Sequence, residues 1–121
     1  MEKVAEKVRS IIIALVPKVF IGDFPTLVSE GVSIRMEEGD EPVKHFVGSA
    51  TKIYKPRVVL TARSANYTQA ATWLEDVRHT LDGYVEGGNF GSLVDTSPRY
   101  NGSDDSKIHE IQETYKIIMR E

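Results

Sequence analysis

The sequence predicts an α+β fold: a mixed, mostly antiparallel four- to five-stranded sheet with two helices packed on one face. Two patterns predict it. In two segments apolar residues recur every three or four positions, as on one side of an amphipathic helix. In several others they alternate with polar residues, as in half-buried strands. The expected order is helix, three strands, helix and two strands, and all 121 residues are expected to form one domain.

The first helix is predicted near the start of the sequence by a stripe of apolar side chains, with charged residues mostly elsewhere. Pro17 is expected to end it, because a proline pushes the preceding residue out of the helical conformation. Residues 18–21 then form a short strand, and Gly22, Asp23 and Pro25 break it. The stripe consists of Val4, Val8, Ile11, Ile12 and Leu15.

Two more strands are predicted before the second helix. Residues 32–37 alternate as a strand with one wet face, the acidic segment 37–42 is predicted to be a turn, and 43–55 is interpreted as a long loop or irregular hairpin tip. Pro56 is expected at the start or edge of the next strand, since it has no N–H to donate. That strand is expected to place Val58, Leu60 and Ala62 on one face and Arg57, Val59, Thr61 and Arg63 on the other.

The second helix has the clearest pattern in the sequence. Asn66 is its predicted N-cap, with Gln69 at the spacing of a capping pair, and Gly83 is expected to end the helix with a positive φ. Trp73 is interpreted as a packing residue, as is Tyr67. The apolar stripe consists of Tyr67, Ala70, Leu74, Val77 and Leu81.

The last third of the chain is predicted to contain two strands separated by a loop. The loop 86–89 leads into a strand at 90–95, and 96–106 is predicted to be a loop. Residues 108–119 fit both an alternating strand and a helical stripe, and their β-branched and aromatic content favours a strand. Strands joined by loops are expected to pair antiparallel, and the crossover through the second helix is expected to make the strands on either side of it parallel.

Composition excludes several classes of function. The chain has no cysteine, which removes disulfides, zinc–thiolate sites and cysteine nucleophiles. Its formal net charge is −3, whereas a module that binds duplex nucleic acid normally has an excess of basic residues. The longest apolar run, 11–16, is too short to span a bilayer, which needs about 20 residues, so no membrane partner is expected.

Catalytic and cofactor motifs are not found in the sequence. The histidines, His45, His79 and His109, lie too far apart for a metal pair at helical spacing. No G-x-S-x-G and no Gly-Lys-Ser or Gly-Lys-Thr is present, and the glycines at 83–91 follow a helix, whereas a phosphate loop precedes one. We therefore expect no enzyme activity, no cofactor and no resident metal.

The segment from Pro56 to Arg63 (PRVVLTAR) leads directly into a helix that begins at Tyr67 with Tyr-Thr-Gln-Ala and ends at Leu81-Asp82-Gly83. A loop with Asp and Gly then precedes the final strand. This arrangement resembles the minor capsid proteins of the tail-terminator, or tail-completion, type from long-tailed bacteriophages. The resemblance is diffuse over nearly the whole chain. The sequence departs from the family in its long segment 37–51 and in the missing glycine at 104–107.

The resemblance implies a structural protein of a phage or prophage, found in the virion and assembled in the bacterial host cytoplasm. Its subunits form a ring, often of six, that caps the tail tube and joins it to the head connector, with DNA only as passing cargo. Contacts with its own copies, the tube protein and the connector are expected at 37–51, 85–89 and 96–107. The candidate contact residues are Glu37, Glu38, Asp40, Glu41, Arg57, Arg63, Glu86, Asn89, Arg99, Tyr100 and Asp104.

Simpler interpretations of these residues remain open. The acidic cluster is also typical of a solvated turn, or it lines a ring and repels passing DNA. Arg57 and Arg63 are also typical of a solvated sheet face, or they pair with acids on a neighbouring subunit. A small ferredoxin-like domain that binds RNA or a small ligand is the alternative function, and a small hydrolase or isomerase is a third.

Overall fold

The computed structural model describes only part of the chain. For residues 2–3, 38–44, 52–54, 101–103 and 120 it describes the backbone alone. The predicted positions of Pro17, Asp23 and Pro25 lie outside it. The described residues are 2–16, 18–22, 24, 30–44, 52–87, 90–95, 98–103 and 108–120.

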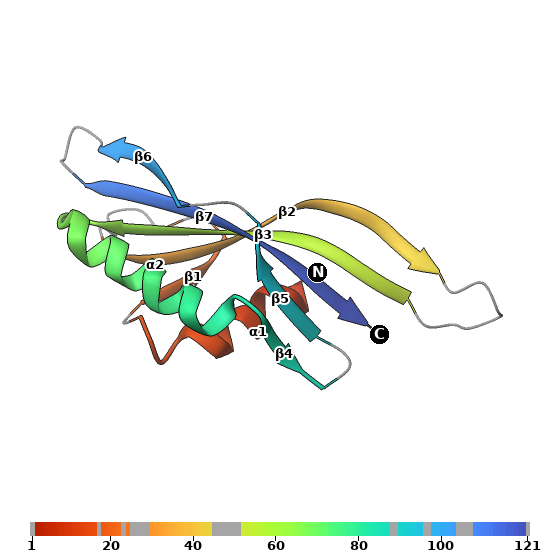
Figure 1. Cartoon of the computed structure of the whole chain (residues 1–121). Coiled ribbons are helices and arrows are strands. Elements are labelled where there is room, and N and C mark those ends of the chain that lie inside the picture. The colour runs from red at the N-terminus through yellow and green to blue at the C-terminus, as the bar shows by residue number, and fades with distance from the viewer. Residues whose placement is uncertain are drawn as a thin grey trace.

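Two helices and seven strands succeed one another along the described residues (Figure 1). The final segment is a strand, as its composition favoured. In chain order the elements are α1 (Glu2–Ile12), β1 (Val19–Ile21), β2 (Gly31–Lys44), β3 (Lys52–Ser64), α2 (Tyr67–Leu81), β4 (Tyr84–Glu86), β5 (Phe90–Val94), β6 (Arg99–Ser103) and β7 (His109–Arg120).

Within the described residues the strands form one mixed sheet in the order β1-β2-β3-β7-β5-β4, with β6 beside β7. Every pairing is antiparallel except that of β1 with β2. The predicted α+β class and mostly antiparallel sheet are confirmed. The strand number is larger than four to five, because β6 lies in the predicted loop 96–106 and β4 lies beside the predicted loop 86–89.

Two of the predicted strand relations differ from the structure. β1 and β2 are joined without a helix yet pair parallel. Because β1 has only three residues, the chain has little distance to cover before β2 starts beside it. β3 and β5 both pair antiparallel with β7, so they run in the same direction, as expected, but β7 lies between them.

The hairpin of β2 and β3 is longer than predicted and extends away from the rest of the molecule (Figure 1). The segment predicted as an acidic turn, 37–42, has a strand backbone, because pairing with β3 overrides the local preference of its residues. The register shifts between Glu37 and Asp40 and again between Asp40 and Val43, so β2 has an extra residue at each of these points. Pro56 lies inside β3, where the pairing with β2 is irregular, and not at the start of the strand.

Both helices cover the same face of the sheet, as predicted (Figure 1). Val58, Leu60 and Ala62 are fully buried on this face. The apolar stripes of the helices pack against them, with two exceptions: Leu15 lies beyond the end of α1 at 37% exposure, and Tyr67 is 48% exposed. The core also contains Val4, Ala5, Val8, Ile12, Val32, Ile34, Ala70, Trp73, Leu74, Val77, Leu81, Phe90, Ile111, Tyr115 and Ile117.

The capping of α2 explains why the helix starts and ends where the sequence predicted. The Asn66 side chain accepts hydrogen bonds from the backbone N–H groups of Thr68 (2.9 Å) and Gln69 (3.3 Å). The Gln69 side chain accepts from the Ser64 hydroxyl, which in turn accepts from the Asn66 N–H, so the capping pair is bridged by Ser64. Gly83 has φ of 80°, as expected just past the helix.

Candidate interaction surface

The sheet face turned away from the two helices is called the open face below. Strand register assigns its residues, because alternate side chains of each strand point to opposite sides. The row containing Thr61, for example, continues through Ser33 on β2 and Gln112 on β7. Among the described side chains, the open face consists of Phe20, Gly31, Ser33, Arg35, Glu37, Lys55, Arg57, Val59, Thr61, Arg63, Val85, Gly91, Leu93, Arg99, Glu110, Gln112, Thr114, Lys116 and Ile118.

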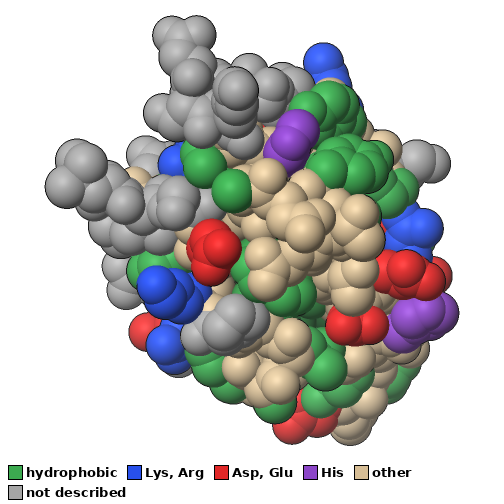
Figure 2. All heavy atoms as spheres, turned by 90° about the vertical axis from the view of Figure 1, so that its left-hand side faces the viewer, with side chains coloured by type: hydrophobic (Ala, Val, Ile, Leu, Met, Phe, Trp, Pro, Cys, Tyr) green, Lys and Arg blue, Asp and Glu red, His purple; other side chains and the backbone are tan. Residues whose placement is uncertain are grey.

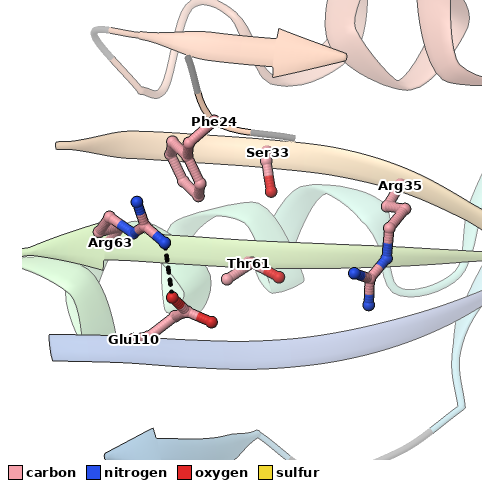
Figure 3. Close-up of a pocket in the computed structure, with 6 residues that line it drawn as sticks. All are labelled: Phe24, Ser33, Arg35, Thr61, Arg63 and Glu110. Atoms are coloured by element: carbon pink, nitrogen blue, oxygen red, sulfur yellow. Dashed lines mark hydrogen bonds and ion pairs between the residues drawn. The ribbon is translucent and has the colours of Figure 1, made fainter. Parts of the chain in front are cut away.

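A shallow hollow of about 280 Å³ lies on the open face, across β2, β3 and β7 (Figure 3). At one end the Arg63 guanidinium lies over the Phe24 ring, with Cζ 4.4 Å from the ring centroid. Arg63 also forms an ion pair with Glu110 at 2.9 Å. At the other end Arg35 reaches across β3 from β2 (Figure 3). Ser33 and Thr61 form the floor. The hollow is polar and offers hydrogen-bond and charge partners rather than an apolar binding cavity.

On the open face, three apolar side chains are exposed at the β4 edge of the sheet. Val85 is 71% exposed, Leu93 51% and Ile118 40%. Val85 lies opposite Gly91, which lies opposite Ile118, so these two side chains share one row and Gly91 leaves room between them. Leu93 lies in the next row of the same face, opposite Lys116. Exposed apolar side chains that cluster on a monomer's surface mark contact sites more often than those scattered singly.

A second polar group lies on the opposite, helix-covered face. Glu113 is fully buried beneath α2, and its carboxylate accepts a hydrogen bond from Arg78 Nε at 2.7 Å. Burial raises the pKa of Glu113 above its usual value, although Arg78 opposes the shift. The hydrogen bond to Glu113 raises the pKa of Arg78, and burial raises that of Tyr115. This cluster holds α2 against β7.

An aromatic group lies where α2 begins. The rings of Tyr67 and Tyr100 meet edge to face at 5.3 Å, and the Tyr100 hydroxyl lies 2.7 Å from His109 Nδ1. Both tyrosines are nearly half exposed. Figure 2 looks onto this end of the molecule and shows a histidine beside a group of hydrophobic side chains. These contacts join the start of α2 to β6.

The structure brings part of the predicted contact set together on the open face. Glu37, Arg57, Arg63 and Arg99 all lie there. Arg57 pairs within the chain with Asp95 at 3.4 Å and Arg63 pairs with Glu110. The side chains of Glu38, Asp40 and Glu41, and all of Asn89 and Asp104, lie outside the described residues.

Two other predicted contact residues lie elsewhere. Glu86 forms an ion pair with Lys7 of α1, and the hydrogen bond from Lys7 lowers the pKa of Glu86. Tyr100 belongs to the aromatic group on the helix-covered side. His79 is exposed, and its Nε2 lies 3.8 Å from Glu75 Oε1.

Sequence reasoning missed Arg35, Phe24, Glu110 and the buried pair. Arg35 was visible as a polar position of an alternating strand, but the sequence did not show that it has no ion-pair partner among the described residues. Glu113 falls in the apolar phase of β7, between Ile111 and Tyr115, and a charged residue in that phase is itself a signal of a buried ion pair. The pairing of Phe24 with Arg63 leaves no sequence pattern, because the chain between them is long.

No group of potential metal ligands occurs among the described residues. None of the helices within those residues is long and apolar enough to cross a bilayer.

No protein-family model matches the chain, and no curated protein matches it. Among solved structures, a chain from the virion of a native gene transfer agent (GTA) particle is similar, with a TM-score of 0.57 and 14% sequence identity. The likeness covers 93% of this chain and 86% of that one. At this identity it shows a shared fold.

Proposed function

We propose that the chain is a structural protein of a phage or phage-like virion. The observation that carries the proposal is the fold shared with a chain of the GTA virion over 93% of the present chain. The likeness extends across both helices and the sheet, so it concerns the whole domain rather than one common motif. A virion subunit acts through contacts with neighbouring proteins, which suits a chain whose distinctive described features are surfaces.

Within the virion, we propose the role of a tail terminator: a ring that caps the tail tube and joins it to the head connector. The resemblance of segment 56–83 to that family supports this role. The long β2–β3 hairpin also suits it, because a strand pair that leaves the body can reach a neighbouring protein (Figure 1). The partners are then other copies of this chain, the tail tube protein and the head connector, while DNA passes through.

The proposed role requires no catalysis and no cofactor. The buried groups with a raised pKa, Glu113 and Tyr115, lie under α2 and serve packing in this proposal. The alternative, a ferredoxin-like domain that binds RNA, has less support. Such sheets present aromatic side chains on central strands for stacking, whereas the central open-face positions described here are Ser33, Val59 and Thr61.

Electron microscopy of particles produced with and without this protein tests the proposal. Without it, we expect unjoined heads beside tails of uncontrolled length, and restoration by the wild-type chain supplied in trans. A Lys7→Ala chain, altered in a surface ion pair, should restore particles equally well. Normal particles in the absence of the protein would reject the proposal. Tails of regular length without heads would retain the virion role and reject the terminator role.

A further inference from the structure

We propose that the open face of one copy binds the outer side of α2 in the next copy, so that the same contact repeats around a ring. This inference rests on the proposed function, which supplies the ring. The two surfaces that meet are identified from their charge and from the exposure of their side chains.

The described side chains of the open face are mostly basic, although the whole chain is acidic. Among the side chains that the structure describes, this face has six basic and three acidic ones, counting Asp95 through its pair with Arg57. The formal net charge of the chain is −3. In the part of the chain that the structure describes, four of these basic side chains have no ion-pair partner, and they are Arg35, Lys55, Arg99 and Lys116. Such a face attracts an acidic surface.

The outer side of α2 is acidic. Glu75, Asp76 and Asp82 are exposed along it and just beyond its end. The strongly basic side chain of this helix, Arg78, is held by Glu113 and does not neutralise them. Figure 2 shows acidic side chains and a histidine grouped along one side of the molecule. The two surfaces are therefore complementary in charge.

Exposed apolar side chains indicate a protein partner rather than a nucleic acid. Val85, Leu93 and Ile118 adjoin the basic rows of the open face, and protein interfaces combine an apolar centre with a polar rim. Interfaces with DNA are more polar and far more positively charged. On α2 the matching apolar contribution is Tyr67, which is 48% exposed at the first position of the helix.

The positions of the two surfaces favour a ring over a closed pair. The open face and α2 lie on opposite sides of the sheet (Figure 1). Two copies therefore cannot each place their open face on the α2 of the other. A row of copies always ends in one unoccupied open face and, at its other end, one unoccupied α2. A repeated contact between unlike surfaces either closes into a ring or continues as an open filament, and the proposed function supplies the ring.

Cross-linking in the assembled particle tests the contact directly. Because the chain has no cysteine, Arg35→Cys and Asp76→Cys introduced together give two unique thiols, which a short bismaleimide can join. We expect a ladder of dimers and higher multimers on a denaturing gel. Arg35→Cys with Glu6→Cys, an exposed position on α1, is the matched control and should give at least about tenfold less multimer. Equal yields from both pairs, or no ladder from the first, would overturn the proposal.

Charge exchange provides a second test. Arg35→Glu with Lys116→Glu should weaken self-association about tenfold, and Glu75→Lys with Asp76→Lys should do the same. All four changes in one chain restore opposite charges across the contact and should recover self-association to within about threefold. Glu6→Lys should have no effect. Unfolding midpoints of each variant exclude misfolding as the cause, and failure of the fourfold variant to recover would contradict the contact.

The two proposals can fail separately. If the protein is missing from purified particles, the proposed function fails, and cross-linking of the purified chain at high concentration then decides the contact alone. If the protein is present in particles but the Arg35–Asp76 pair gives no ladder, the virion role stands and the contact fails.

Discussion

The two faces of the sheet are built from the same strands yet serve different purposes. On the helix-covered face, the row of Ile34, Leu60 and Glu113 is entirely buried. One residue along each strand, the open-face row contains the buried Ser33 and the partly exposed Thr61 and Gln112. It borders Arg35, which has no ion-pair partner among the described residues. Neighbouring residues of one strand thus differ in role: one side chain packs in the core and stabilises the fold, and the next points to the face that can contact a partner.

Ion pairs on the two faces differ in the same way. The carboxylate of Glu113 is fully buried beside Arg78, whereas that of Glu110, beside Arg63, is one-third exposed. A buried charge depends on its partner, because water cannot replace it. An exposed pair exchanges one partner for water or for another protein at little cost. The helix-covered face is therefore intolerant of change, and the open face is free to vary with its partner.

The largest expected effect is the loss of a core side chain. Leu60→Ala should lower the free energy of unfolding by about 3 kcal/mol, because it removes a fully buried side chain from beneath the helices. Thr61, the next residue of β3 on the open face, provides the control. Thr61→Ala should change the free energy of unfolding by less than about 1 kcal/mol. Urea unfolding of both variants measures the difference. Equal losses would show that the open face also carries the fold.

The next effect comes from the buried ion pair. Arg78→Ala should destabilise the chain by about 2 kcal/mol, since Glu113 loses its charged partner in a site closed to water. His79→Ala, at the adjacent exposed position, should change the free energy of unfolding by less than about 0.5 kcal/mol. The same urea titrations compare the two. An Arg78→Ala chain as stable as wild type would contradict the dependence of Glu113 on this pair.

A smaller effect is expected on the pH dependence of stability. Because the pKa of Glu113 is raised in the folded chain, its contribution to stability is full below the unfolded value of 4.5 and is lost as the pH rises through the folded pKa. Glu113→Gln removes this loss. The stability of wild type relative to Glu113→Gln should therefore fall as the pH rises above 4.5. Parallel curves for the two chains would show that the carboxyl does not titrate differently on folding.

The smallest effect is expected at the surface pair of Lys7 and Glu86. Lys7→Ala should leave the unfolding midpoint unchanged, because both side chains are substantially exposed and water replaces the contact. A clear loss of stability in thermal unfolding would mean that this pair anchors α1 to β4 more firmly than its exposure indicates.

The sequence predicted those parts of the fold that depend on local pattern. The limits of α2 followed from Asn66 and Gly83, and the faces of β3 followed from alternation. Pairing over long distances was not predictable. Segment 37–42 has turn composition and becomes strand because β3 lies beside it, and β1 runs parallel to β2 with no local signal.

The candidate surface was predictable only in part. Arg57, Arg63 and Arg99 were expected to make contacts, and register places all of them on the open face. Arg57 and Arg63 already have partners within the chain, whereas Arg35 has none among the described residues. This difference depends on which side chains the sheet brings together. No single segment of sequence contains that information.

The account holds that the open face is free in the isolated chain and covered in the particle. The most direct measurement is maleimide labelling of an Arg35→Cys chain, free and in purified particles, with Glu6→Cys as reference. The account predicts rapid labelling of both positions in the free chain and at least about tenfold protection of position 35 alone in the particle. Equal labelling of position 35 in both states would contradict it.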